Sequence, residues 1–442
     1  MPDKVTRREF LKKTTLAAGL VALGGVWTEG ALAQTKSANG KLNLAGIGVG
    51  GEGGADLNEL VKSPLVNIVA LCDVDENRAA DTFKRFPHAR RYQDFRVMLE
   101  KENKNIDAVT VSTPDHVHAV AATLAMSLGK HVYGQKPLAH SLVEVQAMVE
   151  AARKYKVVTQ MGIQGHPSYA RLVEYINTGV IGPVHEVHVM TDRPIWPQGI
   201  NPPTGNPPIP ATLNWDLWLG PARRRPYNPA YLPFVWRGWW RFGTGAPGDM
   251  GCHLMDGAFW ALSLTHPITI EAVGEPHLSA SGPKYETIRF DFPRRGEQPP
   301  VTLYWHDGGK MIPTDLLEGR KIDPHFNGSL FVGEKGKILN PHGGNPELLP
   351  AAQFADWQPP APYIPRPAGG HYMEWVNACV NGGPTGANFD YSGSLTDTVL
   401  LGNVAFRANH KIEWDALQRK VLNDPKANRY LSDFYRKGWE LY

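Results

Sequence analysis

Near its start the chain reads Leu42-Asn43-Leu44-Ala45-Gly46-Ile47-Gly48-Val49-Gly50-Gly51-Glu52-Gly53. The first half of this stretch is a short apolar run of the kind that forms a buried strand. The second half fits G-x-G-x-x-G, and a helix is expected to follow from Ala55 to Val61. Only glycine lets the backbone turn this tightly and approach a diphosphate, which then meets the amides of the helix N-terminus. The residues expected to hold the phosphates are Gly48, Gly50 and Gly53.

Asp73 supports the same interpretation. It lies twenty residues after Gly53, directly after the second apolar run. A carboxylate there accepts hydrogen bonds from ribose hydroxyls and disfavours the 2′-phosphate of NADP. The sequence therefore predicts NAD rather than NADP, with Asp75 as an alternative to Asp73. A second glycine frame that starts at Gly46 would cut into the strand, so the later frame is preferred.

The rest of residues 41–165 alternates apolar runs with helical stretches such as Leu142 to Lys154. This alternation is typical of βαβ units and of a parallel sheet. We expect an α/β protein whose N-terminal domain, residues 41–165, is a doubly wound parallel Rossmann sheet. Its expected strands are Leu42 to Ile47, Asn67 to Leu71, Ala108 to Val111, His131 to Tyr133 and Val157 to Met161.

Residues 166–442 have a different sequence pattern, in which expected strands lie among long loops. They predict an α+β domain with a large, mostly antiparallel sheet and with C-terminal helices that pack back toward the first domain. Seven prolines between Pro194 and Pro210 predict a loop. The expected strands include Val184 to Met190, Thr287 to Phe292 and Val301 to Trp305.

The N-terminal residues predict export. Thr6-Arg7-Arg8-Glu9-Phe10-Leu11-Lys12 precedes a mild apolar run and then Ala31-Leu32-Ala33, which together fit a twin-arginine signal over residues 1–33. We expect a periplasmic or otherwise exported protein that meets the twin-arginine translocase. Three widely separated cysteines predict no disulfide framework.

Charge and histidine spacing exclude other classes of partner. The net charge is +3 with 20% charged residues, too little for a nucleic-acid footprint. His116 with His118, and His185 with His188, lack a third ligand at a recognisable spacing, and hydride transfer to a nicotinamide needs no metal. We therefore expect neither nucleic acid nor a bound metal.

Three later motifs resemble the glucose-fructose oxidoreductase, inositol dehydrogenase and MocA-like family. They are Ser112-Thr113-Pro114-Asp115-His116-Val117-His118, Gly134-Gln135-Lys136-Pro137-Leu138, and Gly248-Asp249-Met250-Gly251-Cys252-His253-Leu254-Met255-Asp256. The resemblance covers nearly the whole chain after the signal and implies homo-oligomers. It implies that the catalytic residues are Lys136, Asp249 and His253, and that Thr113, Pro114, His118 and Lys136 lie at the cofactor.

One position departs from that family's usual Glu-Lys-Pro, because Gln135 stands where the acid is expected. If the acid normally holds the lysine, its loss leaves the Lys136 ammonium with less charge stabilisation. The role of Lys136 as acid, base or anchor for a hydroxyl is then open.

The residues also make chemical sense without the resemblance. Oxidising an alcohol requires a base for the hydroxyl proton, a donor to polarise the oxygen, and a group that orients the base. Asp249 and His253 are four residues apart, so on a helix they share one face and the carboxylate can orient the imidazole or stabilise its charge. Asp256 lies on the same face or at the helix surface.

Five tryptophans lie between Trp215 and Trp240, where they form a core, a subunit interface or faces for sugar rings. The residues expected at the substrate are His166, Trp236, Arg237 and Asp256.

The sequence thus favours an exported oxidoreductase that transfers hydride from a hydroxyl of a sugar, cyclitol or glycoside to tightly bound NAD. An alternative is a glycoside hydrolase that retains NAD, transiently oxidises C3, eliminates the aglycone and returns the hydride. A third is a dinucleotide-binding sensor without catalysis, which Gln135 suggests.

Overall fold

The computed structural model describes residues 40–442 except residue 277. The expected twin-arginine signal, residues 1–33, lies outside the described residues. Within the described part, no helix is both long and apolar enough to cross a membrane.

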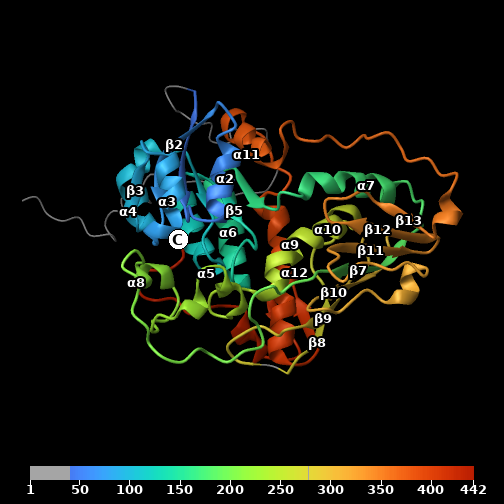
Figure 1. Cartoon of the computed structure of the whole chain (residues 1–442). Coiled ribbons are helices and arrows are strands. Elements are labelled where there is room, and N and C mark those ends of the chain that lie inside the picture. Colours follow the sequence, from blue (N-terminus) through green and yellow to red (C-terminus); the bar gives the residue numbers. More distant parts are fainter. Residues whose placement is uncertain (1–39, 277) are drawn as a thin grey trace, which may run out of the picture. The chain divides into compact units, whose positions relative to one another are not determined.

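The first sheet has six parallel strands in the order β3-β2-β1-β4-β5-β6. The order reverses direction between β1 and β4, where a doubly wound sheet binds its ligand. This confirms the predicted Rossmann sheet, which is blue to green in Figure 1. Its strands are β1 (Leu42–Ile47), β2 (Val66–Cys72), β3 (Arg90–Tyr92), β4 (Ala108–Val111), β5 (His131–Gln135) and β6 (Thr159–Gly162).

The helices of this domain pack on both faces of the sheet. Helix α2 begins at Glu52, three residues before the expected start, although Gly53 and Gly54 are poor helix formers. The glycine at 53 is needed for contact, because a Cβ there would lie 1.8 Å from the carbonyl oxygen of Gly48. The helices are α2 (Glu52–Leu60), α3 (Glu76–Arg85), α4 (Phe95–Glu102), α5 (Asp115–Ser127) and α6 (Leu142–Tyr155).

The second sheet has nine strands in the order β13-β12-β11-β7-β10-β9-β8-β14-β15. Only β7 and β10 pair in parallel, so the prediction of a large, mostly antiparallel sheet is confirmed. The strands are β7 (Val184–Met190), β8 (Thr269–Gly274), β9 (Glu286–Phe292), β10 (Val301–His306), β11 (Gly328–Gly333), β12 (Gly336–Pro341), β13 (Glu347–Leu349), β14 (Ile412–Asp415) and β15 (Lys420–Val421).

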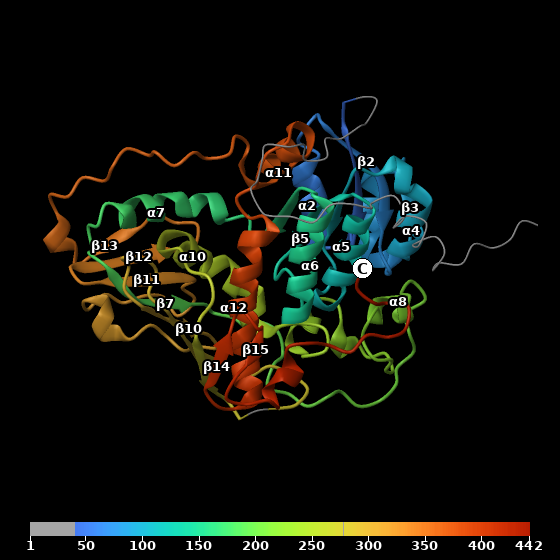
Figure 2. The same cartoon turned by 180° about the vertical axis from the view of Figure 1, so that it is seen from behind.

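Helices join the two sheets. Helix α12 (Phe389–Ala408) contacts α6 of the first domain and β8 of the second, and both views place it between them (Figures 1 and 2). Helix α11 (Gly370–Asn381) contacts α2 and β1. The shorter helices α7 (Ala170–Asn177) and α10 (Asp256–Leu262) pack together beside the second sheet.

The end of the chain crosses back to the first domain as well. Residues 431–442, which we call the C-terminal strap, contact both domains. Arg436 donates from Nε to the carbonyl oxygen of Gly220 at 2.7 Å, and Arg96 of α4 donates to that of Gly438 at 3.0 Å. Trp439 is buried against Arg96, whose guanidinium carbon lies 3.7 Å from the centre of the indole.

Candidate active site

The glycine turn after β1 has the geometry of a phosphate cradle. Gly48 has a φ of 75°, and a Cβ on it would lie 2.7 Å from the carbonyl oxygen of Ser112. Asp73 at the end of β2 fastens the turn, since its Oδ2 accepts from the amides of Val49 at 2.8 Å and Gly50 at 3.0 Å. Burial raises the pKa of Asp73, and these amides oppose the rise. The residues fit a dinucleotide, because side chains are missing where the diphosphate backbone must come close.

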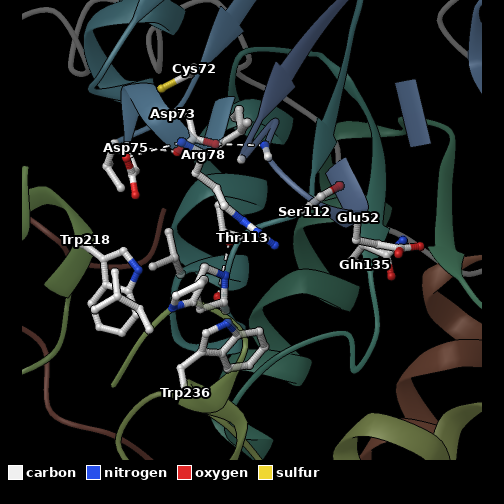
Figure 3. Close-up of a pocket in the computed structure, with 18 of the residues that line it drawn as sticks. Glu52, Cys72, Asp73, Asp75, Arg78, Ser112, Thr113, Gln135, Trp218 and Trp236 are labelled. Atoms are coloured by element: carbon white, nitrogen blue, oxygen red, sulfur yellow. Dashed lines mark hydrogen bonds between the residues drawn. The ribbon is translucent and has the colours of Figure 1, made fainter. Parts of the chain in front are cut away.

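A cavity of about 370 Å³ lies between this turn and residues 217–237 of the second domain. Its volume is in the range of small-molecule sites. Figure 3 shows Asp73 and Arg78 on one side of the cavity and Trp236 on the other. The lining brings together these residues expected at the cofactor or at the reaction: Gly48, Gly50, Asp73, Thr113, Pro114, Lys136, Trp236, Arg237 and His253.

Lys136 is paired with a carboxylate from the second domain. Its Nζ donates to Asp249 Oδ1 at 2.9 Å and to the Asp249 carbonyl oxygen at 2.6 Å. The same Oδ1 accepts from Arg237 Nε at 3.0 Å. Burial alone would raise the pKa of Asp249, but the charges of Lys136 and Arg237 hold it below its ordinary value. The ammonium therefore has a charged partner in Asp249, which comes from the second domain rather than from position 135.

The expected contact between Asp249 and His253 does not form. Residues Pro247–Gly251 make a π-helical turn, which has more residues per turn than an α-helix, before α9 (Cys252–Leu254) begins. The Asp249 carboxylate is instead bound by Lys136 and Arg237. The Nδ1 of His253 is buried without a hydrogen-bond partner among the described residues. Of the two roles expected for Asp249, orientation of His253 by a hydrogen bond is not found among these residues, whereas the Asp249 charge acts on the imidazole by raising its pKa against the effect of burial.

His253 is held in its neutral form. Burial lowers its pKa well below the ordinary value, and the nearby Lys136 charge lowers it further. A neutral imidazole at the cavity wall is able to accept a proton.

Comparison with known proteins gives the family. Residues 42–163 match the oxidoreductase family described as having an NAD-binding Rossmann fold, and residues 201–441 match its C-terminal alpha/beta domain. The chain belongs to this oxidoreductase family. The first domain is thus the family's NAD-binding domain, as the sequence predicts.

Individual relatives match only part of this chain, at low sequence identity. Inositol 2-dehydrogenase of Salmonella typhimurium is 29% identical over 147 residues, which are 32% of this chain and 43% of the relative. Glycosyl hydrolase family 109 protein 2 of Akkermansia muciniphila is 28% identical over 213 residues, 40% and 45% of the two chains. The chain spans less than half the length of these curated relatives.

Solved structures share the fold. The WlbA dehydrogenase from Bordetella pertussis, in complex with NADH and UDP-GlcNAcA, has a TM-score of 0.60 at 16% identity, over 85% of this chain and 99% of that one. Levoglucosan dehydrogenase, in complex with NADH and levoglucosan, has a TM-score of 0.56 at 18% identity, over 84% and 99%. At these identities the likeness concerns the fold.

The unusual Gln135 has a partner that explains it. Its Nε2 donates to both carboxylate oxygens of Asp56 on α2, at 3.0 Å each. Ser112 and Tyr372 donate hydroxyls to the same carboxylate at 2.7 and 2.9 Å. Burial raises the pKa of Asp56 to about 6, against these hydrogen bonds. An acid at position 135 would place a second buried carboxylate beside that of Asp56. The amide of Gln135 instead donates a hydrogen bond to the Asp56 carboxylate.

His118 lies behind the cavity rather than in its lining. Its ring nitrogens face the carbonyl oxygens of Pro137 at 2.9 Å and Thr113 at 2.8 Å. It therefore joins the two loops that carry Thr113 and Lys136, and its expected cofactor role would be indirect. Gly53 also lies behind the lining, where it lets α2 approach the glycine turn.

Two residues expected at the substrate bind each other instead. Asp256 is fully buried and lies 3.0 Å from Nδ1 of His166, and Tyr391 donates to it at 2.5 Å. A position of Asp256 at the helix surface, one of its two expected places, is wrong. Neither residue lines the large cavity, whereas Trp236 and Arg237 do.

The tryptophan cluster is divided between two of its expected places, the core and the cavity wall. Trp215 and Trp239 are buried in an aromatic core with Tyr231 and Phe242. Trp218 belongs to the same core and also lines the cavity, as Trp236 does.

Sequence reasoning missed several residues near the cavity. His342, after β12, has its ring centre 5.8 Å from that of His253. Arg193, after β7, places Nε 3.6 Å from Asp249 Oδ2. Arg78 of α3 lies over the glycine turn, and Trp439 lines the cavity from the C-terminal strap. Of these, only Arg78 follows a known motif closely enough in sequence to be found from it.

Proposed function

We propose that the chain is an exported enzyme that oxidises a secondary hydroxyl of a sugar, cyclitol or glycoside with NAD. The observation that carries this proposal is the meeting of Lys136, paired with Asp249, and neutral His253 at the cavity that also contains the NAD-binding turn.

Three side chains have different roles in the oxidation of the hydroxyl. Lys136 donates a hydrogen bond to the substrate oxygen and stabilises its developing negative charge, while Asp249 holds the ammonium in place. His253 takes the hydroxyl proton, because its lowered pKa leaves the imidazole neutral at pH 7. Bound NAD supplies the acceptor for the hydride.

The proposal includes tight retention of NAD. The loop before α8 (Trp215–Leu219) seals the end of β2, where Asn214 donates its amide to the carbonyl oxygen of Val74 at 2.8 Å and Glu76 donates to that of Thr212 at 3.0 Å. The C-terminal strap adds Trp439 to the wall. Both segments come from outside the Rossmann domain, so a bound cofactor would leave only after they open.

Protein purified without added cofactor should release NAD on denaturation. Mixing it with a panel of sugars, cyclitols and aryl glycosides should produce nicotinamide fluorescence with at least one of them. Lys136→Met should retain NAD and lose this signal, while Lys154→Met, an exposed lysine on α6, should behave as wild type. Protein that neither contains nor binds NAD would overturn the proposal. NAD binding without turnover on any panel member would favour the non-catalytic sensor.

A second candidate is a hydrolase that retains NAD. It is supported by a relative that is named as a member of glycosyl hydrolase family 109. Oxidation at C3 acidifies the hydrogen at C2, a base removes that proton, and the aglycone leaves from C1. Water then adds, with its hydroxyl at C1 and a proton at C2, and the hydride returns to C3, so the net reaction is hydrolysis. Release of an aryl aglycone without net NADH formation supports this candidate, whereas a stable keto-sugar supports the NAD-dependent oxidoreductase proposed first.

Export and assembly complete the proposal. Residues 1–33 support passage through the twin-arginine translocase to the periplasm or beyond, and changing Arg7 and Arg8 to Lys should retain the protein inside the cell. Assembly into homo-oligomers is proposed from the family resemblance, and sedimentation measures it.

A further inference from the structure

A cluster of charged side chains around Asp249, which reaches the cavity through Lys136 and Arg237, holds more positive than negative charge. Lys136, Arg193 and Arg237 converge on Asp249, at 2.9, 3.6 and 3.0 Å from its carboxylate oxygens. One more carboxylate, Asp192, pairs with Arg193. Three cations thus share two carboxylates.

The neighbouring titratable groups do not change this balance. His253 and His342 have lowered pKa values because both are buried, so they are neutral at pH 7. His325, beside Asp192, is 82% exposed, so solvent screens its charge. The side chains of Lys136, Arg193 and Arg237 are only 13, 25 and 19% exposed. Charges this poorly hydrated are normally neutralised by a partner.

Arg237 is oriented toward such a partner. Its guanidinium carbon lies 4.3 Å from the ring centre of Trp236 and 4.7 Å from that of Phe234. Its Nε is bound to Asp249, and Nη1 lies 3.5 Å from the carbonyl oxygen of Phe234. Nη2 makes no hydrogen bond within residues 40–442 as described. The aromatic rings and Asp249 therefore fix a planar donor pair at the cavity wall, a geometry that suits a carboxylate.

We propose that the sugar substrate carries a carboxylate, as a uronic acid does, and that Arg237 binds this group. The inference rests on the proposed function and adds the substrate class. With the acid group on Arg237, the reacting hydroxyl faces Lys136, which shares Asp249 with that arginine. A neutral sugar would leave the extra positive charge without a partner.

Calorimetric titration of the NAD-loaded protein tests the proposal. The probes are glucuronate and galacturonate with their methyl glycosides, each matched with the corresponding neutral glucoside or galactoside. At least one acid should bind about 10- to 100-fold tighter than its neutral partner, the range of a charge-assisted bidentate contact. Arg237→Gln should abolish the difference and Arg237→Lys should restore part of it. Arg294→Gln, an exposed arginine, should leave the difference intact.

Equal or tighter binding of the neutral partners, or binding of neither series, would overturn the inference. So would an unchanged preference in Arg237→Gln. Turnover of a neutral sugar in those cases would leave the proposed oxidoreductase standing. An acid that binds as expected while no panel sugar reduces NAD would support the acid site and overturn the proposed function.

Discussion

Replacing Gln135 with Glu should test why this chain lacks the usual acid before Lys136, the proposed catalytic lysine. The new carboxylate would lie about 3.0 Å from that of Asp56, the present distance of the amide nitrogen. Two ionised carboxylates at that separation repel by roughly 5 kcal/mol at an effective dielectric constant near 20. The folded variant avoids most of this repulsion by keeping one proton on the pair, since burial already raises the pKa of Asp56 to about 6.

That proton makes the stability of the variant depend on pH. The folded variant binds one proton more than the unfolded chain, so stability falls as pH rises, by about 1.4 kcal/mol per unit. The wild-type Asp56 has a pKa of about 6, so it is half ionised in the folded protein at pH 6 and contributes a small slope that disappears as pH rises above 7. Between pH 6 and pH 8, Gln135→Glu should therefore lose about 2 kcal/mol relative to wild type.

Urea unfolding in excess NAD at several pH values measures this loss. The double variant Asp56→Asn with Gln135→Glu reverses the hydrogen bond, with the amide now on the helix, and should recover wild-type stability within about 1 kcal/mol. If Gln135→Glu shows the pH dependence of wild type, or if the double variant is no more stable than the single one, the charge-matching explanation is refuted.

Four further outcomes follow from the site. Asp73→Ser should weaken NAD binding and improve NADP binding, because Arg78 beside the glycine turn can then pair with the 2′-phosphate. Titration with both cofactors measures this, and an affinity for NADP that does not increase would contradict it. Trp439→Ala should release NAD about tenfold faster in a chase experiment, as expected for loss of an aromatic wall, and an unchanged rate would remove the strap from the cofactor site. Lys136→Met should lower kcat roughly 10²- to 10⁴-fold while the NAD content stays at the wild-type value, and loss of NAD would make the residue a cofactor anchor. The pKa of His253 lies well below 6.5, so its protonation should not lower wild-type turnover between pH 8 and pH 6.5. A pH–rate profile measures this. A fall in rate near pH 7 that is absent in a His253→Gln variant with residual activity would contradict the neutral state of His253.

The fold was predictable where local pattern and burial agree. Strands β1, β4 and β7 have the expected bounds, because β1 and β4 are almost entirely buried runs and β7 is buried from Val187 to its end. Strand β3 was missed, since Arg90–Tyr92 is a short polar edge strand with no apolar pattern. The strands from β11 onward were also missed, because they lie among loops and their sequences show little periodicity.

The site was predictable as a set of residues but less so as a geometry. The motifs bring Lys136, Asp249 and His253 into one region, because each follows an element of fixed position. Asp249 binds Lys136 and Arg237, which come from other elements, and the spacing of Asp249 and His253 along the sequence does not show these partners. His342 and Arg193 reach the site through tertiary packing, from strands distant in sequence, so local spacing could not have assigned them.

Helix α11 affects when the protein can fold. Trp375, Val376 and Cys379 complete a core whose other members, such as Leu42 and Leu57, are among the first residues of the domain. A ribosome-bound chain that has emerged only as far as residue 165 would leave this apolar surface open to water. We expect the NAD-binding domain to reach its final stability only after residue 381 has been synthesised, so a fragment that ends between β6 and α11 should bind chaperones and aggregate. Supplying residues 366–385 as a separate peptide should rescue part of its solubility.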